Sequence, residues 1–329
     1  MHAFSPIALF VYARPEHTKK VLSSLALNPE AKDSVLYIFA DGPPKEAPSH
    51  VVEGIREVRR LIRESSWCGE VRIQESAANR GLADSIVCGV TDVVNRHGKV
   101  IVLEDDIAIE PGALAYFNSA LEIYEFDESV MQISGFMVRT PFWAPRTGFL
   151  RMTTSWGWAT WSRAWKNYRG DSALLRREIH EKGHYGFDLD GASFHYEELC
   201  RNERGEIKTW AVKWYASVYL RGGLCLYPHK SVVRNLGFDG SGENCEDDES
   251  GYFKNIPRGS GFLISRCPIK ENSLYLKAMQ NSFRYRLQVW TKTRLRNRAL
   301  RKLRAVLKMR SYFKNLWSVF IPPFIRKKT

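Results

Sequence analysis

The sequence lacks the glycine loops with which the commonest nucleotide-binding enzymes hold phosphate. No Gly-x-Gly-x-x-Gly segment follows the first apolar run, and no Gly-x-x-x-x-Gly-Lys-Ser/Thr segment occurs anywhere. In both loops, glycines let backbone amides approach a diphosphate closely. Their absence disfavours ordinary dinucleotide-dependent dehydrogenases and P-loop enzymes.

Cysteines and long apolar runs are also few. The six cysteines are scattered without a Cys-x-x-Cys pair, which is typical of reduced thiols in a cytosolic protein and does not indicate a zinc site. No segment reaches the roughly 20 apolar residues that a membrane-spanning helix needs. The residues before Ile7 lack the basic region and the small-residue cleavage site of a signal peptide. We therefore expect a cytoplasmic protein.

Acidic residues are missing from one long segment. Residues 284–329 contain 15 Lys and Arg and no Asp or Glu, whereas the residues before them contain 34 basic and 36 acidic side chains. The net charge of +13 therefore belongs to this segment, and the rest of the chain is nearly neutral. A neutral body gives no sign of a nucleic-acid-binding surface.

The basic segment has the pattern of an amphipathic helix. Apolar residues recur at helical spacing over 295–307 between arginines and lysines, and the aromatic and apolar stretch 317–325 is too short to span a bilayer. We expect residues 281–329 to form a tail that binds an anionic membrane surface at the inner face of the cell membrane. This interpretation is favoured over a nucleic-acid arm or a helix docked on another subunit.

Short apolar runs alternate with helical patterns up to about residue 135. This alternation predicts right-handed crossovers and an α/β fold with a mostly parallel sheet flanked by helices. Beyond it, aromatic residues and glycine become frequent, which predicts short strands, loops and a few helices. We expect one domain over 1–280, with a nucleotide-binding half, 1–135, and an acceptor-side half, 136–280. The expected strands are 7–11, 35–40, 71–74 and 99–103, and the expected helices are 16–25, 51–64 and 82–95.

Three carboxylates follow the fourth expected strand. Glu104, Asp105 and Asp106 come directly after the apolar run 100–103, at the end of a strand where open α/β sheets bind ligands. Clustered carboxylates repel one another unless a cation or hydrogen-bond donors compensate their charge. The pattern therefore favours a divalent metal with a phosphate-containing ligand over an acidic turn on a solvated loop.

Four segments in this order resemble the GT-A glycosyltransferases, in particular the bacterial family 2-type sugar transferases and the N-acetylglucosaminyltransferase I group. The first two are 11–15, at the end of the first strand, and 39–42, which carries Asp41. The third is 79–83, similar to an Asn-x-Gly segment that leads into a helix. The fourth is 103–117, similar to the extended metal-binding segment of that group.

The resemblance implies a GT-A, Rossmann-like fold and assigns roles to these residues. Asp106 would ligate Mn²⁺ or Mg²⁺, while Glu104 and Asp105 would contact the ribose or nearby water and amide groups. Asp41 would contact the uracil or ribose, and Arg14 or Arg80 would contact a phosphate. The residues expected to bind the nucleotide sugar are Ala13, Arg14, Asp41, Asn79, Arg80, Gly81, Glu104, Asp105, Trp156 and Gly157.

Two loops in the second half are relevant to the donor sugar. The segment 155–158, with Trp156 and Gly157, resembles a glycine-containing loop of the family that closes over the donor. The segment 235–242 holds three glycines, which suits either a mobile lid or a plain surface loop.

The catalytic base departs from the family pattern. An inverting transfer needs a carboxylate to take the proton of the acceptor hydroxyl. In the N-acetylglucosaminyltransferase I group this acid lies in a Trp-Asp-Asp-Trp segment, but the nearest match here, 210–214, contains no acid. The catalytic candidates are the upstream Glu198 and Asp190.

The expected function is metal-dependent transfer of a sugar from a nucleotide-sugar donor to a saccharide acceptor, free or lipid-linked. The resemblance favours an inverting reaction in the synthesis of a bacterial surface polysaccharide or lipopolysaccharide. Two alternatives stay open: a sugar-phosphate nucleotidyltransferase, and a non-catalytic peripheral membrane-binding protein. The sequence predicts no particular oligomeric state.

Overall fold

The computed structural model describes residues 4–240, 252 and 255–289. The fold below is that of the compact unit Met1–Asn281. Of the second unit, Ser282–Thr329, only 282–289 are described, so the predicted helix at 295–307 and most of the predicted tail lie outside the described residues. Within the described residues, no helix has the length and apolar character required to cross a membrane.

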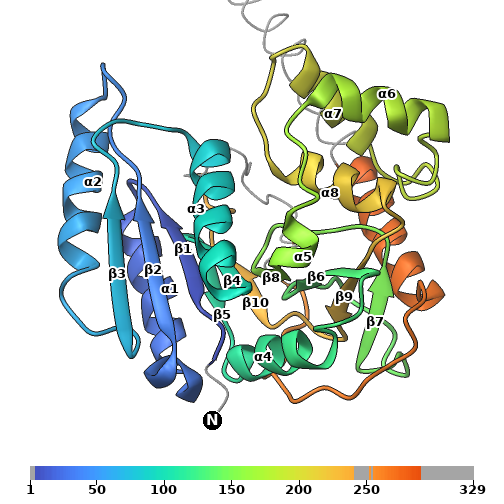
Figure 1. Ribbon diagram of the computed structural model, residues 1–329, viewed down its shortest axis with the longest axis horizontal. Helices are drawn as coiled ribbons and strands as arrows, with labels where there is room; N and C mark the ends of the chain where they lie inside the picture. The colour runs from blue at the N-terminus through green and yellow to red at the C-terminus, as the bar shows by residue number, and fades with distance from the viewer. Residues whose placement is uncertain (1–3, 241–251, 253–254, 290–329) are drawn as a thin grey trace, which may run out of the picture. The chain divides into compact units, whose positions relative to one another are not determined.

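The first half is a parallel sheet with helices on both faces (Figure 1). Strand β1 pairs with β2 on one side and with β4 on the other, giving the order β3-β2-β1-β4. Right-handed crossovers place α1 and α2 on one face and α3, which returns from β3 to β4, on the other. The elements are β1 (Ile7–Val11), α1 (Pro15–Ala26), η1 (Pro29–Asp33), β2 (Val35–Ala40), α2 (Ser49–Leu61), β3 (Glu70–Glu75), α3 (Leu82–His97) and β4 (Lys99–Glu104).

The second half extends the same sheet through β4-β8-β6-β9-β7. Four of the seven strand pairings in this eight-stranded sheet are parallel, which confirms the predicted α/β fold with a mostly parallel sheet flanked by helices. The further elements are β5 (Ile107–Ile109), α4 (Ala113–Ile123), β6 (Val130–Ser134), β7 (Thr147–Leu150), β8 (Trp158–Trp161), α5 (Ser162–Trp165), α6 (Ser172–Lys182), α7 (His195–Glu203), α8 (Ala211–Leu220), β9 (Leu224–Pro228) and β10 (Val233–Asn235).

The strand directions bring distant loops to one edge of the sheet. Because β8 is antiparallel to both β4 and β6, and β9 is parallel to β6, the carboxyl ends of β1, β2, β4, β6 and β9 share one edge. The start of β8 lies at the same edge. A second, two-stranded sheet pairs β10 with β5, so that Asn235 lies opposite Ile107, next to the three carboxylates.

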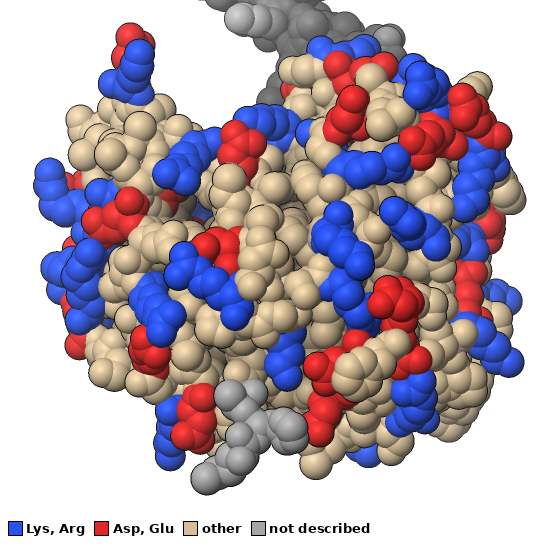
Figure 2. Space-filling model, viewed as in Figure 1, with Lys and Arg blue, Asp and Glu red and all other residues tan. Residues whose placement is uncertain are grey.

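The tryptophans of the second half are mainly core residues. Trp158 stacks on Trp210 with ring centroids 5.1 Å apart, and Trp165 lies 4.9 Å from Trp214. All four are buried against the α3 face of the sheet. On the surface, both signs of charge are interspersed over the face shown in Figure 2, as the nearly neutral body predicts.

Candidate active site

The carboxylates lie where the order of the parallel strands reverses. Strands β1 and β4 are neighbours, and β2 and β3 extend only from the other side of β1. Ligands of open α/β sheets bind outside the carboxyl ends of strands at such a switch point. Arg14, just after β1, donates from Nη2 to Asp106 Oδ2 at 3.0 Å and to Asp105 Oδ1, and from Nε to Asp105 Oδ2 at 3.3 Å.

The charges at this point are not balanced. Burial lowers the pKa of Arg14, but Asp105 and Asp106 raise it overall, so the guanidinium stays charged. Burial raises the pKa of Asp105 against the opposing effect of Arg14. Burial, followed by the charges of Asp106 and Asp105, raises the pKa of Glu104 well above its usual range. One cation therefore faces three carboxyl groups, and a second cation would stabilise their ionised forms.

Two further observations test whether the site suits a metal and an anionic ligand. Arg14 Nη1 is buried and has no hydrogen-bond partner in the described residues, so this donor is left unsatisfied by the protein. Among those residues, no group of three or more His, Cys, Asp or Glu side chains converges as a metal site. Asp106 can supply one oxygen to Mn²⁺ or Mg²⁺, and ligand phosphate oxygens and water would complete the shell, as Mg²⁺ commonly allows.

Strand β10 and the residues after it cover Asp106. Leu236 N donates to Asp106 O at 2.8 Å, and Gly237 N donates to Asn235 Oδ1 at 2.7 Å. His17 Nε2 lies 3.1 Å from Asp239 Oδ2. Sequence reasoning missed this arrangement; its one signal was the glycine-rich segment 235–242, of which 241 and 242 lie outside the described residues.

Gly237 leaves no room for a side chain beside Asp106. A Cβ at this position would lie 2.4 Å from Asp106 Oδ2 and 3.2 Å from Asn235 Oδ1. We expect Gly237→Ala to rotate the Asp106 carboxylate and to lower any activity of the site at least about tenfold, since small misplacements at a reacting centre are costly. Activity and thermal unfolding should be measured together.

Gly170→Ala is the matched control for Gly237→Ala. At Gly170 the nearest atom to a new Cβ is 4.0 Å away, so the same substitution meets no obstacle. Equal activity of the two variants would contradict a role for the Gly237 backbone in orienting Asp106.

Asp41 organises the loop before α3. Its carboxylate accepts hydrogen bonds from Gly42 N at 2.8 Å, from Arg80 N at 3.0 and 3.1 Å, and from Gly81 N at 3.0 Å. Asn79 Nδ2 donates to Gly42 O at 3.2 Å. The structure thus brings Asp41 and residues 79–81 together, with the carboxylate holding the loop.

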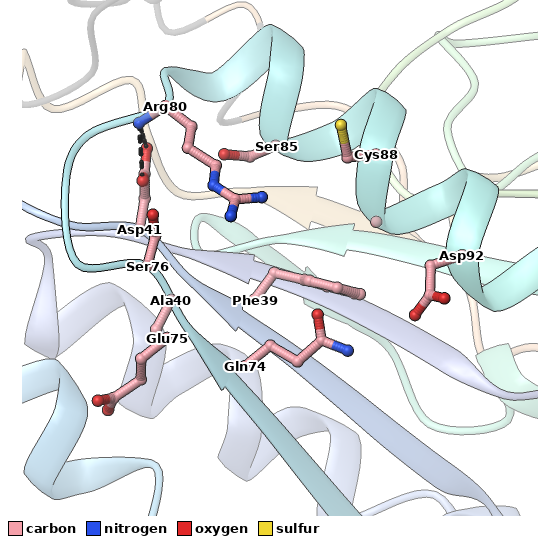
Figure 3. Close-up of a pocket in the computed structure, with 11 residues that line it drawn as sticks. Phe39, Ala40, Asp41, Gln74, Glu75, Ser76, Arg80, Ser85, Cys88 and Asp92 are labelled. Atoms are coloured by element: carbon pink, nitrogen blue, oxygen red, sulfur yellow. Dashed lines mark hydrogen bonds between the residues drawn. The ribbon is translucent and has the colours of Figure 1, made fainter.

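The side chain of Arg80 lines a cavity of about 260 Å³ between α3 and strands β2 and β3. Figure 3 shows it extending from the start of α3 above Phe39, while its backbone amide meets Asp41. No ion pair of Arg80 is formed within the described residues. Ala13, in the turn after β1, packs closely against α2, because a Cβ on Gly54 would lie 2.4 Å from Ala13 O.

Trp156 and Gly157 lie at the start of β8, at the same edge as the carboxylates. The Trp156 ring is 4.4 Å from Phe136 and 5.3 Å from Phe238, between centroids. Gly157 has φ +57°, and a Cβ there would lie 2.8 Å from Val233 Cγ1. This aromatic group therefore connects the ends of β6, β8 and β10.

Asp190 and Glu198 lie in the second half and are not in contact with each other. Asp190 Oδ1 accepts a hydrogen bond from Arg151 Nη2 at 2.6 Å, and its Oδ2 accepts one from Gln280 Nε2 at 2.9 Å. Glu198 Oε1 accepts one from Thr209 Oγ1 at 3.2 Å. These bonds do not connect either carboxylate to the cluster of Arg14, Glu104, Asp105 and Asp106, called the Arg14 cluster below.

Glu198 makes the stability of the protein depend on pH. Burial raises its pKa, and the hydrogen bond from Thr209 only partly opposes this. The native state therefore binds this proton more tightly than the unfolded chain does, and the stabilisation is lost as pH rises through the raised pKa. In urea denaturation, we expect the stability advantage of Glu198→Gln over the unmodified protein to grow as pH rises from about 4, the usual pKa of an unfolded glutamate, through the raised pKa of the native state.

Glu197→Gln is the control, because it removes an exposed carboxylate from the same helical turn. Identical pH dependence in Glu198→Gln and the unmodified protein would contradict the prediction.

No protein-family model and no curated protein matches this sequence. Among solved structures, the chain is similar to TarS of S. aureus (12% identity, TM-score 0.38) over 69% of its own length and 36% of the TarS chain, so it spans about a third of that relative. It is also similar to the galactosyltransferase LgtC, solved with donor and acceptor sugar analogues. The identity is 8% and the TM-score 0.35, over 67% of this chain and 72% of the LgtC chain. A third similarity is to UDP-glucose pyrophosphorylase complexed with UDP-glucose. The identity is 10% and the TM-score 0.34, over 68% of this chain and 90% of the pyrophosphorylase chain. These TM-scores are all below 0.5, so no conclusion about activity is drawn from them.

Proposed function

We propose that this protein is a GT-A-type glycosyltransferase, which moves a sugar from a nucleotide-sugar donor to a saccharide acceptor. The observation that carries the proposal is the cluster of Arg14, Glu104, Asp105 and Asp106 at the strand-order switch point. It combines surplus carboxylates with a buried guanidinium nitrogen that has no protein partner within the described residues. A divalent cation would compensate the charge of the carboxylates, and a diphosphate would accept a hydrogen bond from the guanidinium nitrogen.

In this proposal Asp106 holds Mn²⁺ or Mg²⁺, and Arg14 donates from Nη1 to a phosphate oxygen. The metal, when bound, neutralises charge on the departing nucleoside diphosphate. Asp41 and residues 79–81 lie on the nucleoside side, since β2 is next to β1 at the same edge. Phe136, Trp156 and Phe238 exclude water on the side of the transferred sugar.

For the proton of the acceptor hydroxyl, we propose Glu198 rather than Asp190. A buried carboxyl with a raised pKa accepts a proton more readily at neutral pH than an ordinary one. Asp190, in contrast, is bound by the Arg151 guanidinium. This choice assigns the reaction to the inverting class.

The pathway and location follow from the resemblance and the tail. We propose a saccharide acceptor, free or lipid-linked, in surface polysaccharide or lipopolysaccharide synthesis. The protein would act in the cytoplasm at the inner face of the cell membrane, with the basic residues of 284–329 near anionic lipid.

A thermal-shift screen of UDP, GDP, CMP and dTDP sugars, each with and without Mn²⁺, tests the proposal. A ligand at 100 times its Kd stabilises the native state by about 2.7 kcal/mol. We expect one nucleotide class to stabilise the protein only with metal. When acceptor is added, that donor should release its free nucleotide, which is a nucleoside diphosphate for UDP, GDP and dTDP sugars and CMP for CMP sugars. Release of diphosphate from a nucleoside triphosphate and a sugar phosphate would instead identify a nucleotidyltransferase. If no donor stabilises the protein, both the glycosyltransferase and the nucleotidyltransferase hypotheses are overturned, and a non-catalytic membrane-binding protein is favoured.

A further inference from the structure

Two large aromatic side chains stand out from the loop between β6 and β7. Residues 141–144 form a turn in which Ala144 N donates to Pro141 O at 3.0 Å, and Phe142 and Trp143 are its two central residues. Their exposed fractions are 89% and 65%. Their ring centroids are 4.9 Å apart with an interplanar angle of 85°. Side chains as exposed as these two do not contribute to packing of the core.

The base of this loop is firmly held, so the fold itself directs the rings outward. Thr140 Oγ1 donates to His229 O at 2.9 Å, and His229 N donates to Arg146 O at 2.8 Å. Tyr275 Oη donates to Pro145 O at 2.7 Å. These bonds tie both sides of the turn to His229, which follows β9, and one side also to Tyr275.

Basic side chains lie on and beside the segments that hold the turn. Within the described residues, Arg139, Arg146 and Lys230 form no ion pair, and Arg146 lies 4.7 Å over the ring of Phe262. Elsewhere on the surface, pairing is common. On α2, for example, arginines pair with glutamates three or four residues away. The turn thus combines exposed aromatic surface with basic side chains that have no ion-pair partner among the described residues.

We propose that the Phe142–Trp143 turn inserts into the interface of an anionic membrane. Aromatic rings favour the headgroup region, and basic residues beside them attract anionic lipid. A saccharide platform fits the geometry less well, since rings at 85° to each other do not present their faces to one sugar. The turn follows β6, so membrane contact occurs at the edge of the sheet that carries Asp106. This contact depends neither on the tail nor on the proposed transferase activity.

Vesicle co-sedimentation of the full chain tests the proposal. We expect Phe142→Ala/Trp143→Ala to lower the apparent affinity for mixed phosphatidylglycerol and phosphatidylcholine vesicles at least about tenfold, with unchanged thermal unfolding. Arg139→Gln should lower it about fivefold, with no such effect on pure phosphatidylcholine. Phe126→Ala is the matched control, because Phe126 is 88% exposed but precedes β6, at the opposite end of that strand.

A local readout separates this turn from the basic tail. An environment-sensitive dye is attached at Phe142→Cys or at Phe126→Cys, in a Cys88→Ser background that removes an exposed thiol. We expect a blue shift of dye emission on anionic vesicles at position 142 and none at 126. Equal emission at the two positions, or vesicle affinity unaffected by the double substitution, overturns the proposal. In that case the alternative role, saccharide binding by the two rings, is tested by comparing retention of the double variant and the unmodified protein on immobilised saccharides.

Discussion

Asp106→Asn is expected to lower the rate of sugar transfer by about 10²–10³-fold without unfolding the protein. The loss follows from removing the carboxylate proposed to hold the metal beside the leaving diphosphate, and single electrostatic contacts of this kind contribute effects of that size. Folding should persist, because the substitution removes one of three mutually repelling carboxylates and keeps the side-chain shape. The transfer rate is measured as nucleotide release and Mn²⁺ binding by titration calorimetry. Thermal unfolding shows whether the fold persists.

Glu110→Gln provides the control for Asp106→Asn. Glu110 follows β5, and its carboxylate faces Arg258 at 3.6 Å rather than the Arg14 cluster. Its loss should leave transfer and metal binding nearly unchanged. Full activity in Asp106→Asn, with Mn²⁺ still bound, would show that this carboxylate does not serve the reaction.

Arg14→Ala is expected to lower the free energy of unfolding by about 3–5 kcal/mol, the usual effect of leaving a buried charge without its partner. The side chains of Asp105 and Asp106 are only 6% and 11% exposed, so water compensates little for the lost guanidinium. Urea denaturation at neutral pH measures the change. Arg60→Ala, on the exposed surface of α2, should have a much smaller effect, since its partners remain solvated.

A double variant tests whether charge is the cause. Arg14→Ala/Asp105→Asn removes the cation together with one of its carboxylates, and should recover more than half of the stability lost in Arg14→Ala. If the double variant is as unstable as the single one, the loss comes from packing of the Arg14 side chain instead.

The parallel half of the fold could be read from the sequence because its signals are local. The apolar runs at 7–11, 35–40 and 99–103 and the helical patterns between them correspond closely to β1, β2, β4 and the helices of the structure. Crossover handedness then restricts how such units pack. The position of the three carboxylates at a strand end follows from the same local pattern.

The candidate site was accessible from the sequence only in part. The residues of its acidic end were recognisable because they are consecutive. Arg14 is 91 residues from Asp105, and nothing local indicates that its guanidinium lies between Asp105 and Asp106. Asn235 and Gly237 were equally hidden, since only the pairing of β10 with β5 brings them to Asp106.

By itself, the sequence determined the alternating elements, the acidic strand end and the separation of the basic tail from a neutral body, because periodicity and charge are properties of neighbouring residues. Only the tertiary structure decided which tryptophans of the second half form a core, that Asp41 holds the loop before α3, and that Phe142 and Trp143 stay exposed. Burial and long-range pairing depend on which surfaces the whole sheet brings together, and residue type alone does not specify them.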